Sequence, residues 1–214
     1  MNQLIWVLDS PFSRALKWLL LSKNVQHEDV LLTWEQMPDH KLLAQNNPKK
    51  QVPTLIYNNE PLVDSMLIAM NFLPSDWYKM ADATLFRLAD CDMEAAIIFL
   101  FRANLLREKF GESSNSELMY DSGISTYQSS IDFLLDHVVT DISEFEVNYG
   151  AVLLYSTMAA SWSLSGKQFI DYRYQELKPI LKAIETNSVY RAMIDNYKAN
   201  PDSEVPYELT SVAN

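Results

Sequence analysis

The stretch Gln51-Val52-Pro53-Thr54-Leu55 decides how this chain folds, together with the Asp64-Ser65 pair that follows shortly after it. The proline at position 53 removes one backbone N–H donor, and its peptide bond is of the kind that sometimes adopts the cis form. Such a turn leaves the N–H and C=O of Val52 free for a ligand. Ser65 stands at the head of an apolar run, and a helix beginning there would direct its free N–H groups at an anion. The sequence therefore predicts two sharp turns that converge on one small cleft.

The composition is that of an ordinary globular protein. The chain has 214 residues, 48% of them hydrophobic and 12% aromatic, so it can bury a substantial core in one large domain or two small ones. Only four glycines are present, which argues against a glycine-rich phosphate cradle. The net charge of −11 argues against nucleic acid and anionic membrane surfaces as partners, because both require clustered Lys and Arg. A small anionic ligand is still compatible with this charge if local hydrogen-bond donors overcome the overall repulsion.

The sequence also contains information about metal binding and cellular location. Cys91 is the single cysteine, and the three histidines, His27, His40 and His137, do not have the spacing of metal ligands. Residues 1–9 have no basic region and too short an apolar core for a signal peptide. The longest apolar runs fall well short of the roughly 20 residues that cross a bilayer. We therefore expect a cytoplasmic protein without a metal.

The first 74 residues predict an α/β unit with the element order β-α-β-α-β-β-α. The apolar run 4–8 indicates a strand buried on both faces, and Asp9-Ser10-Pro11 ends it. Ser10 is suited to cap the following helix and Pro11 to occupy its first position. The remaining predicted elements are a strand at 28–32, a helix at about 36–45, a hairpin of 54–57 and 61–63 around Asn58-Asn59, and a helix at 65–73.

The second half of the chain predicts a helical bundle, because no strand pattern recurs after Pro74-Ser75-Asp76. One helix is predicted to begin at Ser143, since Ser143 and Glu146 have the spacing of a capping box. The other predicted helices run through 85–100, 124–138, 177–184 and 190–197. These patterns predict domains at 1–74 and 79–200, followed by an irregular tail at 201–214.

This arrangement resembles the cytosolic glutathione transferase family, in particular bacterial members with a serine in the active site. The resemblance rests on Ser10-Pro11-Phe12-Ser13-Arg14, Asn47-Pro48 ahead of residues 51–55, residues 61–65, the Ser143 capping box, and residues 87–96, which look like the first bundle helix of bacterial members. It implies a thioredoxin-like βαβαββα N-terminal domain, an all-helical C-terminal bundle and, usually, a homodimer.

The resemblance also implies glutathione as the co-substrate. Val52, ahead of a Pro53 that is cis in the family, would exchange main-chain hydrogen bonds with the cysteinyl part of the tripeptide. Asp64 and Ser65 match the acidic-Ser pair that holds the γ-glutamyl end, with Ser65 on its carboxylate and Asp64 facing its ammonium group. The other residues expected to bind glutathione are Phe12, Ser13 and Gln51.

Ser10 matches the position of the catalytic serine. A neutral hydroxyl there would donate to the glutathione sulfur and favour thiolate over thiol, helped by the positive end of the helix that follows. Ser13 is either a second hydroxyl near the sulfur or a solvent-facing residue of the first turn. Arg14 is expected at the surface, and Cys91 is expected to pack within its helix or at a dimer interface.

The implied function is a glutathione S-transferase that directs the thiolate at a small apolar electrophile. The electrophile would bind between the Ser10 loop and the first bundle helix, around residues 101–105. Two alternatives stay open: a non-catalytic protein of this fold that acts through protein partners, and a glutathione-dependent isomerase or dehalogenase. None of these readings involves nucleic acid or a membrane.

Overall fold

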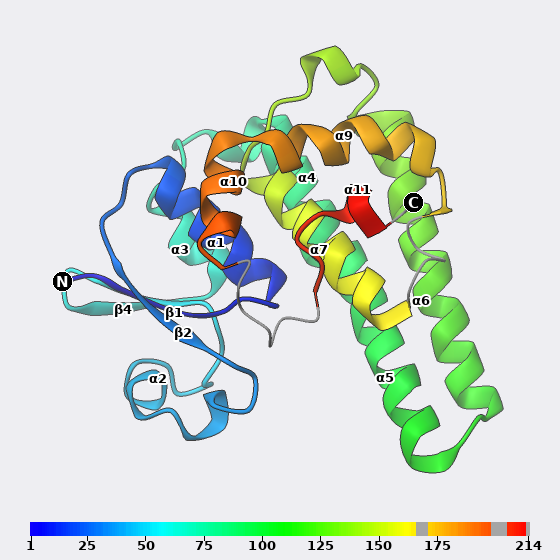
Figure 1. Cartoon of the computed structure of the whole chain (residues 1–214), viewed down its shortest axis with the longest axis horizontal. Helices are drawn as coiled ribbons and strands as arrows, with labels where there is room; N and C mark the ends of the chain where they lie inside the picture. Colours follow the sequence, from blue (N-terminus) through cyan, green and yellow to red (C-terminus); the bar gives the residue numbers. More distant parts are fainter. Residues whose placement is uncertain (166–170, 198–204, 213–214) are drawn as a thin grey trace.

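The N-terminal part of the molecule is built on a four-stranded sheet in the order β2-β1-β3-β4 (Figure 1). We describe it from a computed structural model that covers all residues except 166–170, 198–204 and 213–214. Strands β1 and β2 are parallel, whereas β3 is antiparallel to both β1 and β4. The strands are β1 (Gln3–Val7), β2 (Glu28–Leu32), β3 (Thr54–Tyr57) and β4 (Glu60–Val63).

The sheet buries both of its faces, as the continuous apolar run of β1 predicts. Leu4 and Trp6 belong to the main core with α1 (Pro11–Ser22) and α3 (Ser65–Met70). Ile5 and Val7 point to the opposite face and form a smaller cluster with Leu43 of α2 (Lys41–Asn46). In Figure 1, α1 and α3 lie on the side of the sheet that faces the helical bundle, and α2 lies on the other side.

The turns of this domain follow from their residues. The side chain of Ser10 caps α1, and Pro11 is the first residue of the helix. Asn58 and Asn59 both have positive φ, of 52° and 66°, which is the conformation of a tight two-residue hairpin turn. The helix expected at 36–45 is instead divided into a 3-10 turn, η1 (Met37–Asp39), and α2. Pro38 lies inside η1, and proline has no N–H with which to extend a longer helix.

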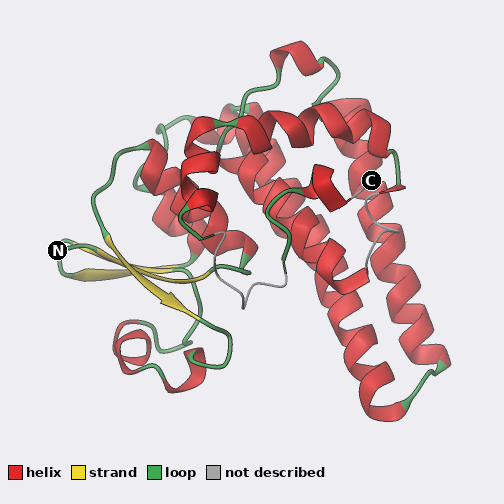
Figure 2. Cartoon of the chain, viewed as in Figure 1, coloured by secondary structure: helices red, strands yellow, loops and turns green. Residues whose placement is uncertain are grey.

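The rest of the described chain is helical, and no described residue after β4 forms a strand (Figure 2). The first bundle helix consists of α4 and α5 joined by the π-helical segment η3. The second, α6, ends in a similar segment, η4. The elements are η2 (Trp77–Lys79), α4 (Ala81–Arg87), η3 (Leu88–Met93), α5 (Glu94–Phe110), α6 (Ser114–Phe133), η4 (Leu134–Val138), η5 (Ile142–Glu144), α7 (Tyr149–Ser165), α9 (Tyr174–Thr186), α10 (Ser188–Asp195) and α11 (Leu209–Val212).

The predicted capping box at Ser143 is wrong. Ser143 lies in the short turn η5, where Asp141 Oδ1 accepts its N–H at 2.8 Å. The helix begins later, at Tyr149, and Asn148 Oδ1 accepts the N–H of Ala151 at 2.9 Å.

The start of α7 is set by its contact with the start of α4. The carboxylate of Asp82 accepts the N–H of Gly150 and, at 2.7 Å, the indole N–H of Trp77. A Cβ on Gly150 would lie 2.2 Å from the carbonyl oxygen of Asp82, so a side chain does not fit at this position. A contact between residues far apart in the chain therefore overrides the local capping pattern.

Two further predictions are corrected by the structure. Cys91 is exposed rather than packed in its helix. In the tail, residues 205–208 form no helix or strand, but residues 209–212 form the short helix α11, and Val205 and Leu209 are buried. Residues 201–204 and 213–214 lie outside the described residues. Within the described residues, every helix is too short or too polar to cross a membrane.

Candidate glutathione site

The register of the sheet brings the three predicted site segments to one end of it. Thr54, the first residue of β3, pairs with Ile5 of β1 and with Val63 of β4. The residues that follow β1, precede β3 and follow β4 therefore meet at the same end of the sheet. They are Ser10, Val52, Pro53, Asp64 and Ser65.

Ser10 stands at the turn between β1 and α1. Its N–H donates to Val7 O at 3.2 Å, and its Oγ accepts the N–H of Ser13 at 3.3 Å. Because Oγ acts as an acceptor here, its own proton remains to donate to another group. Ser10 is 3% exposed, so little of its surface is open to a ligand atom.

Ser13 and Phe12 lie in the first turn of α1, but neither faces solvent freely. Ser13 is fully buried, and its Oγ has no hydrogen-bond partner among the described residues. The alternative prediction that Ser13 faces solvent is therefore wrong. Phe12 is partly buried and packs against the main core.

The loop before β3 is held by Asn47. Its buried amide group donates to Gln51 O and to Thr54 Oγ1, each at 3.0 Å. The side chain of Gln51 is exposed. The peptide bond between Val52 and Pro53 is cis, as the resemblance implies. Among the described residues, no hydrogen bond uses the N–H or C=O of Val52, which therefore stays available to an extended ligand.

Asp64 and Ser65 form the start of α3. Asp64 has a positive φ of 73°, and its Oδ1 accepts the N–H groups of Met66 and Leu67, each at 3.1 Å. Asp64 is exposed, and Ser65 is half-buried as the first residue of the helix. The acidic group thus caps the helix and remains open to solvent.

Two bundle residues, Tyr149 and Asp90, act on the start of α3. The hydroxyl of Tyr149 donates to Ser65 O at 3.4 Å. Burial raises the pKa of the Asp90 carboxyl, nearby Arg87 lowers it, and the charge of Asp64 raises it further. The charge of Asp64 therefore acts on the Asp90 carboxyl, and the two negative charges favour an ammonium group. The effects of both residues on α3 depend on how the two domains pack, so no local sequence pattern predicts them.

The region expected to take the electrophile carries exposed apolar side chains. Ile98, Phe101 and Leu105 are spaced three and four residues apart on α5, so they share one face of the helix. They project away from the buried residues Leu100 and Ala103. Elsewhere in the described part of the chain, no group of three His, Cys, Asp or Glu side chains is arranged to hold a metal ion.

The N-terminal domain matches a known protein family. Residues 4–70 match the family model of the glutathione S-transferase N-terminal domain. A crystal structure of a glutathione S-transferase from Methylobacillus flagellatus KT with glutathione bound superposes with a TM-score of 0.61 at 19% identity, covering 90% of this chain and 98% of that one. The chain has the glutathione S-transferase fold.

Two proteins of Nicotiana tabacum described as probable glutathione S-transferases are similar in sequence. One is 35% identical over 113 residues, which cover 47% of this chain and 49% of the relative. This chain thus aligns with about half the length of that relative. The other is 28% identical over 183 residues, which cover 76% of this chain and 80% of the relative. The second alignment extends the similarity from the glutathione S-transferase N-terminal domain into the helical bundle.

Proposed function

We propose that the protein is a glutathione transferase that activates the glutathione thiol at Ser10 for attack on a small apolar electrophile. The observation that carries the proposal is the meeting of Ser10, Val52-Pro53 and Asp64-Ser65 at one end of the sheet. The similar proteins described as probable glutathione S-transferases, and the similar structure with glutathione bound, support it. Cytoplasmic location and a homodimer belong to the same proposal.

Each segment has a distinct task in this mechanism. The free N–H and C=O of Val52 bind the cysteinyl backbone of glutathione, as an added strand would. Ser65 binds the γ-glutamyl carboxylate through its hydroxyl and the free N–H groups of the helix start, and Asp64 faces the ammonium group. Phe12 and Gln51 border the bound tripeptide, whereas Ser13 is fully buried. This arrangement fixes the ligand at both ends and directs its sulfur toward the β1–α1 turn.

Ser10 acts on the sulfur as a hydrogen-bond donor, not as a nucleophile. Its Oγ already accepts the N–H of Ser13, so its proton points to the remaining partner. A donated hydrogen bond and the positive end of α1 both stabilise the thiolate relative to the thiol, which lowers the pKa of bound glutathione. The thiolate then attacks an electrophile that rests on the exposed apolar face of α5.

Conjugation of glutathione to a nitroaryl chloride tests the proposal, with wild type compared with Ser10→Ala. A hydrogen bond to a charged group contributes about 1.5–3 kcal/mol, so the variant should lose roughly 10- to 100-fold in kcat/KM. Glutathione affinity should change much less, because the binding segments are intact. Unchanged turnover in Ser10→Ala would remove Ser10 from the mechanism, and absence of glutathione binding by wild type would reject the function.

The small exposed fraction of Ser10 favours one competing function, a non-catalytic protein of this fold that acts through protein partners. That function requires no access to Ser10 at all. Recovery of a stoichiometric protein partner, together with an empty cleft after a glutathione soak, would establish it in place of the transferase. A glutathione-dependent isomerase or dehalogenase would instead bind glutathione and give catalysis without net glutathione consumption, or halide release.

A further inference from the structure

Arg14 is a fully buried cation that links the two ends of the chain. Its Nε donates to Leu8 O at 2.6 Å. Its other two nitrogens donate to carbonyls of the C-terminal tail, Nη1 to Pro206 O and Nη2 to Val205 O, each at 3.1 Å. The carboxylate of Asp9 lies 3.8 Å from Nη2. The expectation that Arg14 covers the surface is therefore wrong.

The contacts of Arg14 enclose the turn that carries Ser10. Leu8 lies two residues before Ser10, and its carbonyl is held by the side chain of Arg14. The backbone N–H of Arg14 donates to the carbonyl of Ser10 at 3.0 Å. The Arg14 side chain thus holds the backbone just before Ser10, while the bond to the Ser10 carbonyl is the ordinary helical bond of the backbone.

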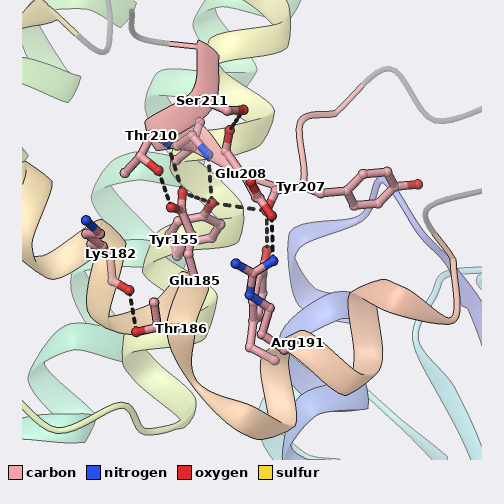
Figure 3. Close-up of polar contacts among 11 residues, drawn as sticks. Tyr155, Lys182, Glu185, Thr186, Arg191, Tyr207, Glu208, Thr210 and Ser211 are labelled. Atoms are coloured by element: carbon pink, nitrogen blue, oxygen red, sulfur yellow. Dashed lines mark hydrogen bonds and ion pairs between the residues drawn. The ribbon is translucent and has the colours of Figure 1, made fainter.

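The tail that holds the other side of Arg14 is itself firmly docked. The ring of Tyr207 lies 5.2 Å from the guanidinium carbon. The carbonyl of Tyr207 accepts the hydroxyls of Tyr155 and Tyr190 at 3.2 and 3.1 Å. Further along, Figure 3 shows Thr210 hydrogen-bonded to the buried carboxylate of Glu185, which also accepts the Tyr155 hydroxyl at 2.7 Å.

We propose that Arg14 is a positioning residue for Ser10, and that the C-terminal segment 205–207 braces it. The planar guanidinium holds three carbonyls in fixed directions, which a single ammonium group does not reproduce. If the tail moves away, Arg14 loses two of its three acceptors, and its hydrogen bond to Leu8 loses its support. The inference rests on the proposed function, because it describes how the Ser10 hydroxyl is aimed at the glutathione sulfur.

Two variants and one control test this role. Arg14→Lys keeps the positive charge but removes the guanidinium that donates to three carbonyls in fixed directions. Any change in the thiol pKa therefore reports geometry rather than charge. Tyr207→Leu weakens the same brace from the tail and leaves the backbone carbonyls in place. The control, Arg191→Gln, removes the exposed ion pair of Arg191 with Glu208, 2.7 Å long, which contacts the same tail but not the Ser10 turn.

The measurement is an ultraviolet titration of the thiolate of bound glutathione against pH, together with the glutathione Kd. We expect both test variants to raise the pKa of the bound thiol by about one unit, which is tenfold less thiolate at a pH below that pKa. The Kd should stay within about threefold of wild type, since the tripeptide is held by other segments. Arg191→Gln should titrate as wild type does.

The outcomes distinguish the positioning role of Arg14 from the proposed glutathione transferase function. A wild type that does not bind glutathione, or binds it with an unshifted thiol pKa, overturns both. A wild type with a lowered thiol pKa that persists in the two test variants overturns the positioning role alone, as does an equal shift in the Arg191→Gln control. If Arg14→Lys does not fold, the titration of Tyr207→Leu decides.

Discussion

Ser10 and Ser13 lie three residues apart at the start of α1, but only the Ser10 hydroxyl has a hydrogen-bond partner among the described residues. Ser10 Oγ accepts the N–H of Ser13 and thereby satisfies one of the free donors at the start of α1. Ser13 Oγ is buried without a partner among the described residues. A buried polar atom of this kind costs free energy on folding unless a ligand completes it.

We therefore expect the two alanine variants to change stability in opposite directions. Ser13→Ala removes a buried unpartnered hydroxyl and improves helix propensity, so the free energy of unfolding should rise by about 0.5–1 kcal/mol. Ser10→Ala removes a helix cap and should lower it by about 1 kcal/mol. Urea denaturation of the two variants and wild type gives both values. A loss of stability in Ser13→Ala would show that this hydroxyl does have a structural partner.

At this scale the sequence predicts residues whose partners are local. The Ser10 cap follows from a serine before a proline, and the left-handed hairpin turn follows from two adjacent asparagines. Arg14 could not be placed, because two of its acceptors lie 191 and 192 residues away along the chain.

Among the structural elements, α7 depends most on another element for its position. Asp82 at the start of α4 is almost fully buried and receives the N–H of Gly150 at the start of α7. The adjacent Tyr149 stacks on Phe86 of α4 with the ring centroids 5.5 Å apart. The two helix starts therefore form one unit, and the hydroxyl of Tyr149 extends that unit to Ser65.

Loss of the Asp82 carboxylate should destabilise this unit. In Asp82→Ala, the buried donors of Gly150 and Trp77 lose their acceptor, at a cost of about 1–3 kcal/mol each. We expect the free energy of unfolding, measured with urea, to fall by roughly 2–5 kcal/mol. Asp141→Ala removes the matching contact at the exposed turn η5 and serves as the control. Equal effects of the two variants would contradict the importance of the contact between α4 and α7.

The same carboxylate should give the protein an unusual pH dependence. Burial raises the pKa of Asp82, although the hydrogen bonds from Trp77 and Gly150 and the charge of Lys23 oppose this. The folded state therefore binds the proton more tightly than the unfolded state. The contribution of Asp82 to stability is then largest at low pH and decreases as pH rises through the raised pKa.

Asp82→Asn tests that sign, because the amide does not titrate. The free energy of unfolding of wild type minus that of the variant should grow as pH falls from neutral to about 4, the ordinary pKa of Asp. Urea denaturation across this range measures the difference. If the difference shrinks on acidification, the hydrogen bonds to the carboxylate outweigh its burial, and the pKa is lowered instead.

At the level of elements, the order β-α-β-α-β-β-α and the helical second half are both predictable. Hydrophobic runs, turn residues and helical spacing are local signals, and they agree with the final fold. The start of α7 is not predictable, because Ser143 has the local pattern but Gly150 has the required contact with Asp82. For the site, the turns at Val52-Pro53 and Asp64-Ser65 are predicted from their residues and Ser10 from the family resemblance. The effects of Asp90 and Tyr149 on α3 depend on packing between the domains.

The whole molecule carries a net charge of −11, and its proposed ligand is an anion at neutral pH. Glutathione must therefore approach against a repulsive field and be held by short-range donors. Salt screens charges separated by more than about 10 Å at 0.1 M, and hardly affects direct hydrogen bonds.

We expect the association rate constant of glutathione to rise with ionic strength. Between about 10 and 150 mM salt the increase should be roughly two- to threefold, since the Debye length falls from about 30 to 8 Å. Stopped-flow tryptophan fluorescence measures the rate, and a monoester of glutathione, which has no net charge, is the control that should show little change. A rate that falls with salt would mean that a local positive field guides the ligand in.

The most direct test of the account is a crystal structure of the protein soaked with glutathione. We predict that the tripeptide pairs with the backbone of Val52, that its γ-glutamyl carboxylate lies at Ser65, and that its sulfur lies within hydrogen-bond reach of Ser10 Oγ, about 3 Å or slightly longer for a thiolate. An empty cleft, or a bound glutathione whose sulfur points away from Ser10, would contradict the central claim.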